Sequence, residues 1–201
     1  AARPGDAVLG EEGGERASSS PGSGLRWIVD PLDGTVNFLF GIPQWSVSIA
    51  CEAPGETLAA VVHDALRGET FTAAAGGGAA VNGRPIRGSD RAELATAMVA
   101  TGFSYDAATR ALQAQTVARV LPRVRDIRRF GSAAIDLAWT ACGRYDAYYE
   151  RGLQAWDLAA GACICRGAGL ELRELAATEQ PAGLLVAPGA LVEGLQALVG
   201  S

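Results

Sequence analysis

The sequence predicts a layered α/β (α+β) fold with two sheets, the first mainly antiparallel and the second alternating with helices. Three observations predict it. Short apolar runs separated by turn signals fill residues 1–95, strand-like and helix-like periods alternate over residues 96–201, and neither a repeat nor a flexible linker divides the chain. With 201 residues, of which 49% are hydrophobic, the chain is long enough for one domain or two small ones. We therefore expect a β-rich half, 1–95, and an α/β half, 96–201, that share an interface and complete one active site.

The first half opens with 24 polar, glycine-rich residues that predict a loop, above all the stretch SSSPGSG at 18–24. Apolar or alternating segments that favour strands follow, and the Asn82-Gly83 pair in the last of them is typical of a two-residue hairpin turn. Pro31 and Gly34 predict a sharp turn directly after the first of these strands. The predicted strands are residues 26–30, 45–52, 58–65 and 70–75 and the two sides of the hairpin 81–86.

The second half alternates strands with helices. Pro122 ends the first predicted helix, because proline cannot continue the hydrogen-bond pattern. Ser132 and Gly143 have the residue types that begin and end a helix between them. The predicted strands are residues 97–103, 124–130, 146–150 and 183–187, and the predicted helices are residues 106–121, 132–143, 155–169 and 188–200.

Composition excludes several classes of function. The net charge of −5 disfavours a nucleic-acid partner, which usually requires a basic face. No apolar stretch approaches the roughly 20 residues of a membrane span, and the first residues lack the pattern of a signal peptide. All 17 basic residues are arginine, so Schiff-base chemistry and a lysine-containing P-loop are excluded. We expect a cytoplasmic protein with free thiols that binds neither membranes nor nucleic acids.

The segment WIVDPLDGTVNF at 27–38 holds the most informative residues. A hydrophobic strand ends at Asp30, and the turn keeps Asp33 on the same side, so that two carboxylates can converge on a hard cation. The Leu32 carbonyl lies between them. Gly34 and Thr35 then begin a short helix, whose N–H groups and hydroxyl suit an anion beside the metal. Metal and anion sites side by side are what phosphoryl chemistry needs. The alternative is an ordinary loop, since Asp-Pro and Asp-Gly are common turn dipeptides.

The same segment resembles the metal-binding signature of the inositol monophosphatase family, WxxDPxDGTxNF. The similarity extends to Gly-Glu-Glu at 10–12 and to AWDLAAG at 155–161, which is similar to the family's WDxAAG helix. This resemblance implies the sugar-phosphatase fold, in which helices and two sheets are stacked as αβαβα. It also implies a magnesium-dependent phosphatase that acts on a small phosphate monoester and forms a homodimer.

The resemblance implies a particular set of ligands for two Mg²⁺ ions, with a third and weaker ion in some members of the family. Glu11, Asp30 and the Leu32 carbonyl would hold one ion, and Asp30, Asp33 and Asp157 the second. Such paired ions activate a water molecule and stabilise the leaving alkoxide. Without cations these acids repel one another, so we expect a loose site. The alternatives are a solvated acidic loop for Glu11 and helix capping for Asp157.

Substrate contacts also follow from the resemblance. Gly34 and Thr35 would cradle the phosphate, and Thr35 would also take part in catalysis. Glu150 would accept hydrogen bonds from substrate hydroxyls, which suits an acceptor-only carboxylate. Ser132 and Ala133 match a family segment beside the sugar ring, although helix capping is an equal alternative for Ser132.

Three other residues keep open or structural interpretations. His63, the single histidine, lies in an alternating strand and is interpreted as structural, which disfavours a histidine-based mechanism. For Arg128 and Arg129 two interpretations stay open. They support the site or a subunit contact, or they lie on a solvated strand edge.

The sequence departs from the family at its beginning. Family members carry two helices before Gly-Glu-Glu, and these supply an aspartate that pairs with the threonine of Asp-Gly-Thr, whereas ten residues precede Glu11 here. Asp6 is too close to Glu11 to be equivalent. We expect the outer face of the first sheet to be bare. We also expect the chain to bind magnesium but to hydrolyse phosphate poorly.

The predicted function is magnesium-dependent hydrolysis of a small polyol phosphate, with inositol monophosphate as the expected substrate because YYERGLQAWD at 148–157 matches that family pattern most closely. Histidinol phosphate, fructose 1,6-bisphosphate and 3′-phosphoadenosine nucleotides are alternative substrates. A function of a different class is a non-catalytic binding module whose bare sheet contacts a partner protein.

Overall fold

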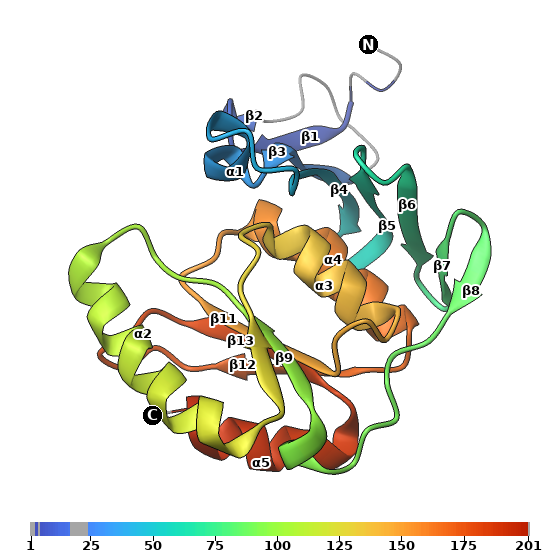
Figure 1. Cartoon of the computed structure of the whole chain (residues 1–201). Coiled ribbons are helices and arrows are strands. Elements are labelled where there is room, and N and C mark those ends of the chain that lie inside the picture. Colours follow the sequence, from blue (N-terminus) through green and yellow to red (C-terminus); the bar gives the residue numbers. More distant parts are fainter. Residues whose placement is uncertain (1–2, 4, 17–23, 201) are drawn as a thin grey trace.

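The structure, a computed structural model, describes residues 3, 5–16 and 24–200. Sheet A, helices α3 and α4, sheet B, and helices α2 and α5 are stacked in that order, while the short helix α1 lies beside the end of β3 (Figure 1). None of the helices in the described part of the chain has the length and apolar character that a membrane span requires. The helices are α1 Thr35–Leu39, α2 Ala107–Val120, α3 Ala133–Ala141, α4 Ala155–Gly167 and α5 Gly189–Val199, with 3₁₀ turns at Leu94–Thr96 and Leu121–Arg123.

Sheet A has eight strands in the order β2-β1-β3-β4-β5-β6-β7-β8. All neighbouring strands are antiparallel except β1 and β3, which are parallel, so the predicted antiparallel character is confirmed. The Asn82-Gly83 pair joins β7 to β8 with positive φ angles at both residues. The strands are β1 Ala7–Gly10, β2 Gly14–Arg16, β3 Arg26–Asp33, β4 Ser46–Ala53, β5 Glu56–Asp64, β6 Glu69–Ala74, β7 Ala79–Val81 and β8 Arg84–Ile86.

The prediction that the first 24 residues form a loop is wrong for two segments. Strand β1 pairs in parallel with β3, and β2 turns back to pair with β1. Both are short and lack a clear alternation, so their extended conformation depends on the neighbouring β3 and leaves no local signal. The predicted loop at 18–24 lies, apart from its last glycine, outside the described residues.

Sheet B has five strands in the order β10-β9-β11-β13-β12. The three strands β10, β9 and β11 are parallel, and β13 is antiparallel to both of its neighbours. Strand β12 is absent from the sequence prediction because it is an edge strand with mostly exposed, charged side chains. The strands are β9 Met98–Thr101, β10 Asp126–Arg128, β11 Ala147–Arg151, β12 Glu171–Leu175 and β13 Gly183–Ala187.

Two apolar cores hold the layers together. The first surrounds α3 and α4 and joins both sheets, with Val62 and Phe71 of sheet A and Tyr148 of sheet B fully buried. The second lies between sheet B and helices α2 and α5 and includes Val120 and Leu195. No helix of the described residues covers the outer face of sheet A, as expected, so these residues form four of the five layers of the stack (Figure 1). The predicted fold class is confirmed.

The end of β3 positions the candidate site. The register between β3 and β4 shifts between Asp30 and Asp33, so the strand continues through a β-bulge where the sequence predicts a turn after residue 30. The chain turns only at Gly34, whose φ angle of 92° is left-handed. A Cβ atom added there would lie 2.9 Å from the Gln44 carbonyl oxygen, so only glycine fits.

Candidate functional site

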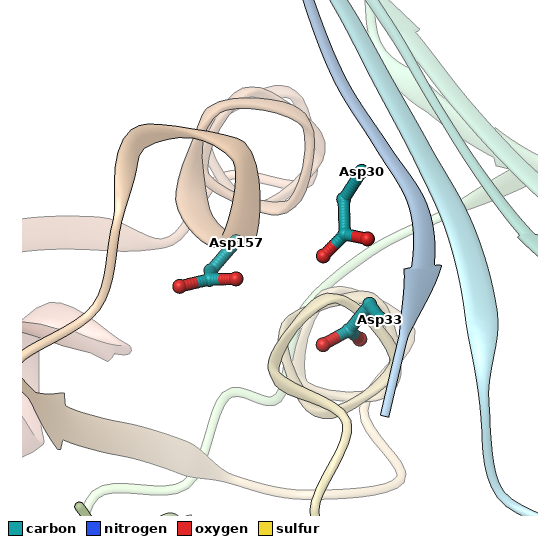
Figure 2. Close-up of side chains that lie close together, drawn as sticks. All are labelled: Asp30, Asp33 and Asp157. Atoms are coloured by element: carbon teal, nitrogen blue, oxygen red, sulfur yellow. The ribbon is translucent and has the colours of Figure 1, made fainter. Parts of the chain in front are cut away.

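Three carboxylates converge between the end of β3 and the start of α4. Asp30 and Asp33 come from the bulge of β3, and Asp157 comes from the first turn of α4 (Figure 2). One oxygen from each of the three side chains lies within 4.8 Å of the other two. Two segments that are more than 120 residues apart therefore bring together the acids that the sequence predicts as shared ligands of the second metal ion.

Asp33 is the most tightly held of the three. Its carboxylate is buried and accepts hydrogen bonds from the N–H groups of Ala133 (3.2 Å) and Ala134 (3.0 Å). The hydroxyls of Ser132 and Ser46 also donate to it. These donors, three at the N-terminus of α3 and Ser46 at the start of β4, stabilise the ionised form, yet burial is stronger and raises the pKa of Asp33.

Asp30 and Asp157 each use one oxygen for local structure. The Leu32 N–H donates to Asp30 Oδ1 at 2.9 Å, and the Gln154 N–H donates to Asp157 Oδ2 at 2.7 Å. Asp157 is thus a helix-capping residue and a member of the acidic cluster at the same time. Burial, together with repulsion from Asp33 and Glu11, raises the pKa of Asp30 to about 7 and that of Asp157 to about 6. Among the residues that the structure describes, none supplies a positive charge that lowers these two pKa values.

The cluster opens into a cavity of about 560 Å³. Every residue that the sequence predicts for the site lines this cavity except Ser132, whose buried hydroxyl instead contacts Asp33. A larger cavity, of about 1150 Å³, lies at the other end of α4, but none of the predicted site residues lines it. The predicted site residues therefore gather at the smaller cavity.

Glu11 lies apart from the three-acid cluster. Its side chain is exposed on the cavity wall, and its N–H contacts the Val29 carbonyl at 3.4 Å. It is close enough to contribute to the raised pKa values of Asp30 and Asp157. Thr35 donates its hydroxyl to the Leu32 carbonyl at 2.9 Å, so this carbonyl already has one partner.

Glu150 lies elsewhere on the cavity wall. It is half-buried, and burial raises its pKa to about 7, although the Tyr148 hydroxyl donates to Oε2 at 2.8 Å. A Cβ atom at Gly102 would overlap with the Glu150 carboxylate, so the glycine makes room for this side chain.

Two residues near the site were not predicted from the sequence. Ser46 supports Asp33, and its only signal is an inward-facing polar side chain at the start of an alternating strand. Asp136, in α3, is buried, and its Oδ1 has no hydrogen-bond partner among the described residues. Burial and the charge of Glu150 raise its pKa well above the usual range. In the sequence, Asp136 is a single polar residue in an apolar helix. No other acidic or metal-binding residue at a regular spacing from it indicates a function.

The comparisons with known proteins agree with this geometry. A model described as the inositol monophosphatase family matches residues 1–197. Inositol-1-monophosphatase SuhB of Mycobacterium tuberculosis is 46% identical over 205 residues, which cover 98% of this chain and 71% of that protein. The Nus factor SuhB of Xylella fastidiosa is 48% identical over 169 residues, covering 84% of this chain and 60% of that protein. The solved structure of Mycobacterium tuberculosis SuhB matches with a TM-score of 0.86 and 40% identity over 98% of this chain and 76% of that one.

Proposed function

The chain belongs to the inositol monophosphatase family, and from this premise we propose that it hydrolyses a small polyol phosphate, most simply an inositol monophosphate, with Mg²⁺. The observation that carries the proposal is the cluster of Asp30, Asp33 and Asp157 in a cavity that also contains Glu150. In the proposal, the three acids bind the cations that hold the phosphoryl group. Glu150 binds a hydroxyl of the leaving group.

The donor set fits a hard divalent cation. All of the clustered groups are carboxylates, and Mg²⁺ prefers oxygen ligands. We propose Asp30, Asp33 and Asp157 as ligands of one ion, and Glu11, Asp30 and the Leu32 carbonyl as ligands of another. Such ions would supply positive charge that lowers the pKa of water and neutralises the phosphate oxygens.

The remaining residues position these ligands and the substrate. Ser132, with the N–H groups of Ala133 and Ala134, holds Asp33 in place. In the proposal, Gly34 and Thr35 receive the phosphate, since both line the cavity next to Asp33. Ala133 shapes the wall beside the leaving group, and Glu150 accepts a hydrogen bond from one of its hydroxyls.

The test measures phosphate release from myo-inositol 1-phosphate in Mg²⁺ and in excess chelator. We expect Mg²⁺-dependent release that falls at least 100-fold in Asp30→Asn, because that substitution removes the shared ligand. Asp126→Asn is the control, since Asp126 pairs with Arg128 outside the cavity. Release that is unaffected by the chelator or by Asp30→Asn would contradict the proposal.

The expected homodimer is a further part of the proposal. Side chains of α1 and the following loop form an exposed apolar segment, here called the apolar ridge: Val36, Phe38, Leu39, Phe40 and Ile42. Contiguous exposed apolar surface commonly marks an interface. We expect Phe40→Asp to reduce the mass measured by light scattering from dimer to monomer, and Leu121→Asp, at a distant exposed position, to leave it unchanged.

A binding function is the second candidate. The uncovered outer face of sheet A, in the part of the chain that the structure describes, offers a surface for a protein partner. A relative that is 48% identical carries the name Nus factor and not a phosphatase name. If Mg²⁺ neither binds to this chain nor raises its stability, the binding function is favoured over the enzyme.

A further inference from the structure

Arg129, an exposed residue directly after β10, lines the same cavity. Its guanidinium makes no hydrogen bond or ion pair with the residues that the structure describes, although the cavity wall contains several acids. The side chain is nevertheless positioned. The guanidinium carbon lies 5.6 Å from the centre of the Phe103 ring, and Nη1 packs against Gly131, where any Cβ atom would overlap with it. A cation–π contact and a glycine thus hold an otherwise unpaired cation at the site.

Glu150 lines the same cavity as this cation. The Glu150 carboxylate packs against Gly102, and the Arg129 guanidinium packs against the next residue, Phe103. The positive charge of Arg129 also counteracts the rise in the pKa of Glu150 that burial causes. Arg129 and Glu150 therefore line the same cavity, one as a hydrogen-bond donor and the other as an acceptor.

This pair suits a neutral hydroxyl better than a second anion. An alcohol group donates one hydrogen bond and accepts others, so it can donate to Glu150 and accept from Arg129 at the same time. An anion at Arg129 would lie close to the carboxylates of Glu150 and Asp136, both of which the charge of Arg129 reaches. The repulsion would offset much of the attraction.

We propose that Arg129 is a specificity-determining residue that donates a hydrogen bond to a substrate hydroxyl oxygen while Glu150 accepts the proton of the same hydroxyl. This inference rests on the proposed function and names its substrate class: phosphate esters with a free hydroxyl next to the esterified carbon. An ester without that hydroxyl leaves both side chains unpaired and binds more weakly.

The experiment compares two esters of the same skeleton in the full chain with Mg²⁺. Glycerol 2-phosphate carries hydroxyls beside the esterified carbon, and isopropyl phosphate carries none. We expect the wild type to prefer glycerol 2-phosphate in kcat/KM. Arg129→Ala should lower that preference about tenfold through a higher KM, which corresponds to one charge-assisted hydrogen bond. The kcat/KM for isopropyl phosphate should fall at most about twofold in Arg129→Ala.

Two further variants sharpen the result. Arg129→Lys should recover part of the preference, because the ammonium group also donates. Arg128→Ala is the matched control, since Arg128 pairs with Asp126 at 2.6 Å and does not line the cavity. If Arg129→Ala leaves the preference unchanged, or lowers both esters equally, the inference is overturned. If the wild type releases phosphate from neither ester, nor from myo-inositol 1-phosphate, the proposed function itself has failed.

Discussion

The hydroxyl of Ser132 joins the start of α3 to Asp33, 99 residues earlier in the chain. The same oxygen accepts the N–H of Ile135 at 3.4 Å and so caps the helix. One hydroxyl therefore serves both the helix cap and the acidic cluster. The capped start of α3 holds the Asp33 carboxylate in position.

We expect Ser132→Ala to lower the free energy of unfolding by about 1–3 kcal/mol, because it removes a helix cap and a buried hydrogen bond to a carboxylate. It should also weaken Mg²⁺ binding, since Asp33 loses a donor that fixes its position. Urea unfolding and a calorimetric Mg²⁺ titration measure the two effects. Thr140→Ala is the control on the same helix, because its hydroxyl contacts only the Asp136 carbonyl. Equal loss of Mg²⁺ affinity in both variants would contradict the linkage.

The acidic cluster also predicts how stability depends on pH. Burial and mutual repulsion raise the pKa of Asp30 to about 7 and that of Asp157 to about 6. Because the folded chain then binds more protons than the unfolded chain, metal-free protein should lose stability as the pH rises from about 4 to about 7. Mg²⁺ neutralises the ionised acids, so its stabilising effect should be larger at pH 8 than at pH 5.

Urea unfolding at both pH values, in chelator and in Mg²⁺, measures this dependence. Asp30→Asn should be more stable than the wild type in chelator at pH 8 and should gain less from Mg²⁺. A metal-free protein that becomes more stable between pH 5 and 8 would show that the cluster does not control the dependence.

Substitution of Gly34 tests the turn that positions the Asp33 side chain. Alanine there must adopt a φ angle of 92°, and its Cβ would lie 2.9 Å from the Gln44 carbonyl oxygen. Gly41 is the matched control, because its φ angle of 68° is also left-handed but a Cβ would meet nothing within 4 Å. Gly41→Ala should cost about 1 kcal/mol of stability, and Gly34→Ala about 1–3 kcal/mol more. Thermal unfolding of both variants measures the difference, and equal costs would mean that the close approach is relaxed.

The grouping of the candidate site residues could be predicted where local sequence patterns mark them. Asp30, Asp33 and Gly34 follow a recognisable strand, and Asp157 has its own helix motif, so local patterns mark all four. Ser46 and Asp136 could not be predicted, because their roles depend on contacts with residues distant in the sequence.

The same reason explains the strands. Strands β4, β5 and β6 carry runs of apolar or alternating residues, and the sequence predicts them. Strands β1 and β12 have no such pattern. Their extended conformation depends on pairing, β1 with β3 and β12 with β13, and the sequence alone does not show this pairing. The sequence likewise predicts a turn where the structure has the bulge at Asp30, since proline and glycine mark both features.

Gly102 is predicted to act only through Glu150. Alanine at this position would overlap with the Glu150 carboxylate and displace a half-buried side chain to which the Tyr148 hydroxyl donates a hydrogen bond. We expect Gly102→Ala to raise KM for glycerol 2-phosphate about tenfold, as the loss of one hydrogen bond to a charged group would. In a background of Glu150→Ala the same change should have almost no effect, because no carboxylate remains to be displaced. Independent, multiplicative effects in the double variant would instead mean that the glycine shapes the loop after β9 by itself, and the position of Glu150 would then need another explanation.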